Sequence, residues 1–234
     1  MITWTDIESV GNNTSQPLTR IHWMRTLDAL QYSLFALGLF LLVPSFNQGW
    51  FKAMTPWYLI PLVALLAAVL LLPPCSGEPW LANGLWRLRA SAILTLGFSP
   101  FIYWYRNLGG NLYLLIGAFL AVLFFFWYLG EYTELFRKVA AKADEPRLEQ
   151  RARLVRQVLL YLGAVPLISL HVSFLVWPLV MPNHSFSDAA ALWFHAPLPF
   201  LGVMTLPPAL FFLFIGAFRR SAMHWPDPVW QQLH

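Results

Sequence analysis

Histidine is the residue best suited to chemistry inside an apolar segment, and one histidine of this chain occupies such a position. His171 lies in the run Ser169-Leu170-His171-Val172-Ser173, and residues 158–181 around it contain no Asp, Glu, Lys or Arg. An ionisable side chain in hydrocarbon is costly and marks a candidate functional site. As a neutral imidazole it could ligate a haem or other metal, relay a proton, or hydrogen-bond a neighbouring helix. His171 is therefore our candidate cofactor-binding residue, with a packing hydrogen bond as the alternative.

Other patterns that would indicate catalysis are incomplete. His184 and Asp188 are four residues apart and could face one metal ion with His195, but a credible site needs three or four ligands with supporting contacts. Ser99 is followed by Pro100, whereas a membrane serine-protease motif has Gly there. Cys75 is the single cysteine, which excludes an intramolecular disulfide and any two-cysteine motif. We therefore expect a non-catalytic protein, and the sequence names no cofactor.

The densest cluster of charge is a basic segment at residues 131–157. Glu134 and Lys138, and likewise Glu149 and Arg153, have the i,i+4 spacing of favourable pairs on a helix. Asp144-Glu145-Pro146 predicts an N-cap followed by proline in the first helical turn. The segment is thus predicted to be a helical hairpin that turns near Asp144. Seven of the fifteen Lys and Arg residues lie in it: Arg137, Lys138, Lys142, Arg147, Arg151, Arg153 and Arg156.

Such a hairpin has two interpretations. Basic clusters next to membrane helices bind anionic lipid or an acidic partner, so we predict that these seven residues contact a cytoplasmic partner or lipid. The alternative is a solvated pair of charged helices with no binding role.

The elements that must hold these residues are long apolar blocks. The chain is 58% hydrophobic and 11% charged, whereas soluble domains carry about 25% charged residues. A helix needs roughly 20 residues to cross a ~30 Å hydrocarbon core. We therefore predict an all-α polytopic membrane protein with six transmembrane helices, at about residues 29–46, 57–74, 88–105, 112–130, 158–181 and 196–218.

The distribution of positive charge predicts the side of the membrane that each loop faces. Thirteen of the fifteen Lys and Arg residues lie in alternate gaps between the blocks, and the intervening gaps hold only Lys52 and Arg106. Cytoplasmic loops retain positive charge, so both termini and the hairpin are predicted to be cytoplasmic. The resulting division is a tail and interfacial helix (1–28), four spans (29–130), the hairpin (131–157), two spans (158–218) and a tail (219–234). The interfacial helix could equally be the lower extension of the first span.

The tryptophans and the prolines can each be interpreted in two ways. Most of the twelve tryptophans lie near predicted span ends, which is typical of an interfacial belt; some of these rings could instead line a groove for a lipid, quinone or pigment. Pro100, Pro166 and Pro207-Pro208 fall inside predicted spans. They predict either kinked helices in a packed bundle or a hinge.

Thin outer loops, short soluble segments and the lack of a reaction centre favour a non-catalytic integral subunit of a larger membrane complex. We expect its partners to be the lipid bilayer and other membrane or cytoplasmic subunits, in a bacterial cytoplasmic membrane. Nucleic acid is not an expected partner, because the basic residues sit beside membrane segments. The absence of carboxylates deep in the spans argues against an ion-coupled transporter.

Two other functions remain open. A helix before the first span, six spans, and a short amphipathic segment before the last span resemble export permeases of the ABC-2 type. That resemblance implies the membrane half of an exporter driven by a separate ATPase. His171 and the aromatic rings support instead an electron-transfer anchor associated with haem or quinone.

Overall fold

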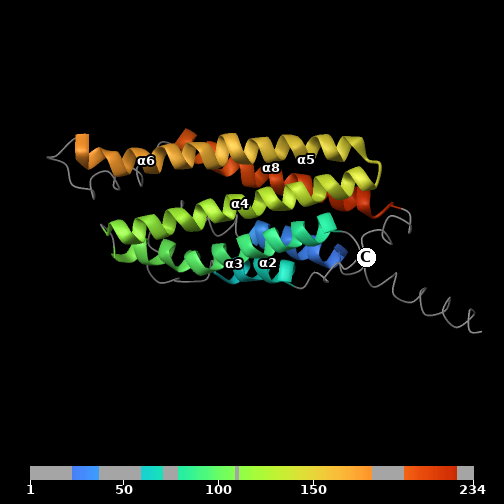
Figure 1. Cartoon of the computed structure of the whole chain (residues 1–234), viewed down its shortest axis with the longest axis horizontal. Helices are drawn as coiled ribbons and strands as arrows, with labels where there is room; N and C mark the ends of the chain where they lie inside the picture. The colour runs from blue at the N-terminus through green and yellow to red at the C-terminus, as the bar shows by residue number, and fades with distance from the viewer. Residues whose placement is uncertain (1–22, 37–58, 71–78, 109–110, 181–197, 226–234) are drawn as a thin grey trace, which may run out of the picture.

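The long apolar runs of the sequence form long helices that lie roughly parallel in an elongated bundle (Figure 1). The computed structural model describes residues 23–36, 59–70, 79–108, 111–180 and 198–225. Within these ranges the regular structure is helical and contains no strand, which confirms the all-α prediction. The elements are a helix at residues 23–36, α2 (Leu59–Leu70), α3 (Pro79–Leu108), α4 (Leu112–Lys142), α5 (Pro146–Val158), the π-helix η2 (Leu159–Ala164), α6 (Val165–Val180) and α8 (Leu198–Ala222).

Helix α4 runs from the fourth apolar block into the hairpin without a break. Asn111 caps its start, because the side-chain carbonyl accepts a hydrogen bond from the backbone N–H of Tyr113 at 2.9 Å. The helix has 31 residues, about 46 Å at 1.5 Å per residue, which exceeds the ~30 Å hydrocarbon core of a bilayer. Its last turns therefore extend beyond any membrane that the apolar part crosses.

The turn between α4 and α5 lies where the sequence predicts it. Asp144 has a φ of 54°, a left-handed conformation that Asp tolerates better than most residues. Pro146 occupies the start of α5, where its missing N–H has no intrahelical partner to lose. Glu145, directly before the proline, is the N-cap of α5, and its side chain makes no capping hydrogen bond.

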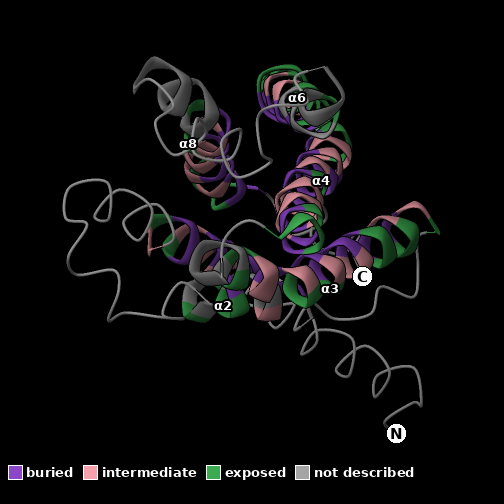
Figure 2. Cartoon of the chain, turned by 90° about the vertical axis from the view of Figure 1, so that its left-hand side faces the viewer, coloured by how far each residue is buried: buried purple, intermediate pink, exposed green. Residues whose placement is uncertain are grey.

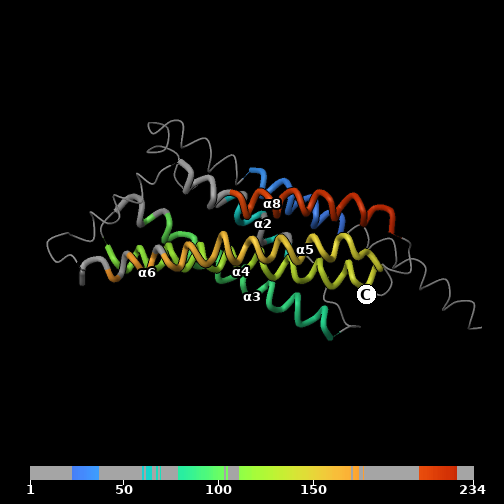
Figure 3. Tube along the Cα trace, turned by 90° about the horizontal axis from the view of Figure 1, so that it is seen from above, coloured from blue at the N-terminus to red at the C-terminus, as the bar shows by residue number. Residues whose placement is uncertain are grey.

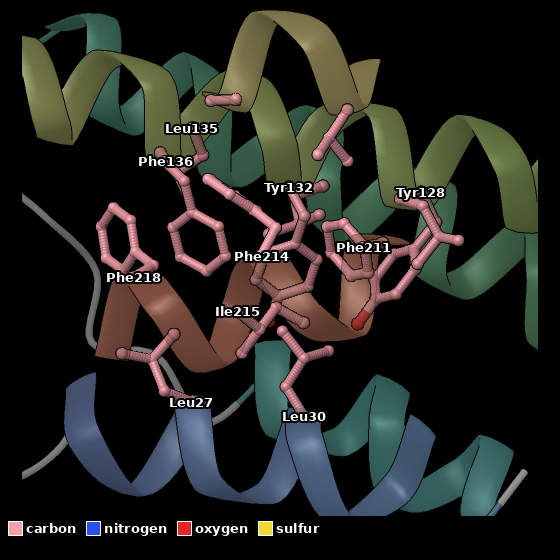
Figure 4. Close-up of a cluster of buried hydrophobic side chains, with 14 of the residues drawn as sticks. Leu27, Leu30, Tyr128, Tyr132, Leu135, Phe136, Phe211, Phe214, Ile215 and Phe218 are labelled. Carbon is pink, nitrogen blue, oxygen red and sulfur yellow. The ribbon is translucent and has the colours of Figure 1, made fainter. Parts of the chain in front are cut away.

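An aromatic face on α4 packs against an aromatic face on α8 at the centre of the bundle (Figure 4). The α4 residues recur every fourth position, so they form one stripe along the helix. The rings of Phe136 and Phe218 stack with centroids 4.4 Å apart, and Tyr132 meets Phe211 at 6.3 Å. Such pairs contribute about 0.5–1.5 kcal/mol each beyond simple burial. The two faces are Tyr128, Tyr132 and Phe136 on α4 and Phe211, Phe214 and Phe218 on α8.

The helix at residues 23–36 runs beside α8 along one edge of the bundle (Figure 3). Its buried stripe of Trp23, Leu27, Leu30 and Leu34 joins the central core. Asp28 forms an ion pair with Arg219 of α8. The helix passes through residues 28 and 29 without interruption. Residues 37–46 of the predicted first span lie outside the described residues, so the choice between an interfacial helix and a lower extension of the span stays a prediction.

Helix α3 shows how an apolar block can contain polar residues. Ser91, Thr95 and Ser99 are buried, and each hydroxyl donates to a backbone carbonyl of the same helix, at 2.7–2.9 Å. Pro100 lacks the N–H that would bond to the carbonyl of Leu96 in a regular helix. The Ser99 hydroxyl donates to that carbonyl at 2.8 Å instead. The hydroxyls are therefore satisfied locally, and α3 continues through its proline.

Two helical stretches in the described part of the chain are long and apolar enough to cross a membrane, Leu112–Lys142 and Pro146–Ser173. Figure 2 shows exposed residues of α3 and α6 in green, and large apolar side chains are among the exposed residues of these helices. On α6 these include Val165, Ile168 and Val172. Extended apolar surface of this kind marks a membrane or protein contact. Both observations support membrane association, while the six spans and their orientation stay a prediction.

Close packing of α3 on α4 depends on Gly117, and this generates a testable prediction. A Cβ at this position would lie 2.3 Å from Cδ1 and 2.9 Å from Cβ of Phe101. We expect Gly117→Ala to lower the free energy of unfolding by about 1–3 kcal/mol, because Phe101 or the helix must move. Denaturant unfolding of the purified protein in detergent micelles measures the change.

Gly97→Ala on α3 is the matched control, since nothing lies within 4 Å of a Cβ placed there. It should leave stability unchanged or raise it by up to about 1 kcal/mol through its higher helix propensity. Equal destabilisation by both substitutions would contradict the close contact at Gly117.

Candidate functional site

The hairpin is joined by a network of ion pairs between α4 and α5. Arg137 of α4 donates two hydrogen bonds to the carboxylate of Glu134, at 3.0 and 2.8 Å, and a third to Glu149 of α5 at 3.2 Å. Arg156 of α5 reaches back to Glu134 at 2.9 Å, and Arg153 bonds Glu149 at 2.6 Å. Two carboxylates thus bind three guanidinium groups, and two of the contacts connect the helices.

The network changes the ionisation of its carboxyl groups. Hydrogen bonds from Arg137 hold the pKa of Glu134 below its ordinary value of 4.5, against the opposing effect of burial, and the charges of Arg156 and Lys138 lower it further. The Arg153 hydrogen bond likewise lowers the pKa of Glu149. Both groups are therefore charged at neutral pH and lose the network only under acid conditions.

Three of the seven predicted contact residues, Arg137, Arg153 and Arg156, form ion pairs with Glu134 and Glu149 of the same chain. The Glu149–Arg153 pair is confirmed. Glu134 forms direct ion pairs with Arg137 and Arg156, while the charge of Lys138 acts on it favourably and lowers its pKa. The i,i+4 rule considers one helix and misses a partner on another. The other four basic residues comprise half-buried Lys138 and exposed Lys142, Arg147 and Arg151.

A groove of about 550 Å³ lies between α4 and the segment that runs from α5 through η2 into α6. At one end it is lined by polar groups, Glu131, Arg156 and Gln157. The walls and the other end are apolar and include Phe124, Trp127, Leu160, Tyr161 and Ile168. The groove therefore lies where the apolar part of the bundle meets the charged hairpin.

The π-helix η2 forms one wall of this groove, and its cause is local. Pro166 cannot donate a backbone hydrogen bond, and its ring would clash with the carbonyl four residues earlier in a regular helix. In η2 the backbone N–H of Val165 donates to the carbonyl of Leu160, five residues back. Gly163 in the same segment contacts the Phe126 ring of α4 so closely that a Cβ would lie 2.3 Å from its Cε1. The predicted kink or hinge at Pro166 stays a prediction; the structure has a π-helix directly before Val165 and Pro166.

Glu131 is a nearly buried carboxylate at the polar end of the groove. Its Oε1 accepts hydrogen bonds from Arg87 Nη2 of α3 at 2.6 Å and from the Trp127 indole N–H at 2.9 Å. Trp127 also lines the groove, as one of the two interpretations of the tryptophans predicts. Sequence reasoning missed the Arg87 partner, although the i,i+4 spacing of Trp127 and Glu131 could have indicated their bond.

His171 lies buried on α6 against α4. Its Nδ1 is 2.8 Å from the carbonyl of Leu167, which can only accept, so Nδ1 carries the proton. Its ring stacks on Phe119 with centroids 4.2 Å apart and planes 25° apart. These are the contacts of the packing alternative, and the cofactor role stays a prediction. No cluster of three or more His, Cys, Asp or Glu that could hold a metal occurs among the described residues; His184, Asp188, His195 and Cys75 lie outside them.

Comparisons of the chain with protein-family models, with curated proteins and with solved structures find no match. The chemical capacity of the site therefore follows from its own groups. The groove offers aromatic and aliphatic walls with a guanidinium and an amide at one end. The hairpin offers exposed guanidinium groups on α5. Both arrangements are suited to binding.

The hairpin network predicts an acid-sensitive contribution to stability. Glu134→Gln should lower the free energy of unfolding at pH 7 by roughly 0.5–1 kcal/mol, the range for a partly exposed pair. Because the folded pKa of Glu134 is lowered, its contribution is full above pH 4.5 and is lost as the pH falls through the folded pKa. Unfolding of the wild type and the variant in micelles, from pH 7 to pH 3, measures the difference.

The difference between wild type and Glu134→Gln should shrink steadily below pH 4.5. Arg147→Gln is the control, because Arg147 is exposed and lies outside the network; it should change stability little at any pH. A Glu134→Gln effect that is independent of pH would show that packing, not charge, causes it.

Proposed function

We propose that this chain is a non-catalytic integral subunit of a larger membrane complex, and that the outer face of α5 contacts a partner subunit. The observation that supports this proposal is a surface with two charges and one apolar side chain on a helix. Arg147, Arg151 and Leu154 are exposed at i, i+4 and i+7 and so share one face. Arginine flanking an exposed apolar side chain is typical of protein interfaces.

The hairpin is held firmly enough to present this face. Leu148, Ala152 and Val155, on the opposite side of α5, are buried in the core. The Ser221 hydroxyl of α8 donates to the Glu145 carboxylate at 3.2 Å, which joins the turn to the last helix. A preorganised surface loses less conformational entropy on binding. The partner that fits it carries acidic side chains around a small apolar surface.

The proposal includes the predicted topology: six spans, with both termini and the hairpin in the cytoplasm. Its support is the alternation of basic loops and the apolar helices described above. In a Cys75→Ser background, Arg147→Cys should react with a membrane-impermeant maleimide only after the cells are opened. Asn111→Cys, at the opposite end of α4, should react in intact cells. The reverse pattern would overturn the orientation.

Co-purification tests the partner contact. The full chain is isolated from its native membrane in mild detergent, and the retained proteins are identified by mass spectrometry. The double variant Arg147→Gln/Arg151→Gln should retain the partner at least about ten-fold less than wild type, since each charged contact contributes on the order of 1 kcal/mol or more. Arg153→Gln is the control, because Arg153 is paired with Glu149.

The outcome also separates this proposal from its alternatives. A chain that elutes alone as a monodisperse monomer from native membrane would contradict the subunit role. A retained ATPase whose turnover depends on this chain would establish the permease alternative. A haem absorption band that disappears in His171→Ala would establish the electron-transfer alternative.

A further inference from the structure

The groove between α4 and η2 differs from the partner surface, and its shape and polarity indicate a ligand of a different kind. Its volume of about 550 Å³ lies within the range of sites that bind small organic molecules. On α4 the lining extends from Leu123 to Glu131, about 12 Å along the helix axis. The groove is therefore long enough to hold an extended aliphatic segment.

Polarity changes in one direction along the groove. Because α4 and the α5–η2–α6 segment are antiparallel (Figure 1), Leu123 and Phe124 share one end with Ile168, and Glu131 shares the other with Arg156 and Gln157. The apolar end adjoins the membrane-length part of α4, and the polar end adjoins the hairpin. An amphiphile has the same gradient, from its apolar chains to its polar head group.

Arg156 can bind a phosphate while it remains in the hairpin network. Its bond to Glu134 uses Nη1, and a guanidinium has five N–H donors. Its side chain is 53% exposed and lines the groove. Guanidinium groups bind phosphate through paired hydrogen bonds, and basic pockets at the cytoplasmic ends of membrane helices bind lipid head groups.

The acidic group at the same end is compensated. Arg87 and the Trp127 indole both bond Oε1 of Glu131, so its negative charge is balanced before a ligand enters. The same bond fixes the orientation of the indole, which lines the groove as an apolar wall. Gly130, next to Glu131, leaves this wall open, because nothing lies within 4 Å of a Cβ placed there.

From these contacts we propose that the groove is a binding site for a single glycerophospholipid. The phosphate binds Arg156 at the polar end, and one acyl chain lies along Phe124, Leu160 and Ile168. The site holds the lipid between the membrane-length helices and the hairpin.

Lipid titration followed by native mass spectrometry tests this site. The delipidated full chain in mild detergent is titrated with phosphatidylglycerol and, separately, with diacylglycerol carrying the same acyl chains. The first phosphatidylglycerol should bind about ten-fold more tightly than diacylglycerol, because a charged hydrogen bond to phosphate is added. Arg156→Gln should remove most of this preference, whereas Arg153→Gln, which does not line the groove, should retain it.

A second pair of variants tests the groove by filling it. Gly130→Leu should lower the affinity for both lipids about ten-fold or more, because its side chain extends into open space in the groove. Gly97→Leu also enters open space, but on α3 away from the groove, and should leave both affinities unchanged. A Cβ at either glycine meets nothing within 4 Å, so we expect both variants to fold.

Three results would overturn the proposal. One is equal affinity of the wild type for phosphatidylglycerol and diacylglycerol. Another is equal lipid affinity of Gly130→Leu and Gly97→Leu, which would mean that lipid binds around the bundle without using the groove. The third is a co-purifying polypeptide, not lipid, that is lost in Gly130→Leu. Retention of the partner subunit is measured in a separate experiment. Failure of the lipid-site proposal can therefore be told apart from failure of the proposed subunit role.

Discussion

The contact between the aromatic faces of α4 and α8 positions the functional features of this chain. Tyr132, Phe136, Phe211 and Phe218 lie within it almost without solvent exposure. With α8 held there, the α5–η2 segment packs beside both helices. The segment that forms one wall of the groove is therefore packed against both α4 and α8. Removing a ring from such a core costs several kcal/mol, about 3–5 for Phe→Ala, so the geometry of both sites is coupled to this contact.

Several charged side chains of the hairpin pair with one another and so stabilise the fold. Glu134 and Glu149 bind three of the seven arginines and lysines of this segment, and the number of basic residues therefore overstates the charge that a partner could meet. The rule that keeps basic loops in the cytoplasm counts Lys and Arg and gives little weight to Asp and Glu. Internal pairing and a role in orientation are thus compatible. Arg147 and Arg151, which stay outside the network, define the outward face of α5.

The π-helix links the two regions. The π-helix lies directly before Val165-Pro166, and Gly163 lets the Phe126 ring come close at the level where the apolar bundle gives way to charge. This irregular segment forms a wall of the groove, with Arg156 just before it and Ile168 just after it. A bound lipid at this position would contact both the hairpin and the membrane-length helices. The proposed partner surface and the proposed lipid site thus lie on one continuous element.

The sequence by itself determined the helices and the turn at Asp144–Pro146. These follow from apolar spacing and from backbone restrictions that act within a few residues. The hydrogen bonds of buried Ser91, Thr95 and Ser99 are local in the same way, since each hydroxyl donates to a backbone carbonyl of its own helix. Only the tertiary structure decided the pairing of Arg87 with Glu131, 44 residues away, and of Arg156 with Glu134, 22 residues away. The groove also required it, because its walls come from separate segments. Which side chains meet across two helices depends on how each helix is rotated and packed, and local spacing does not encode that rotation.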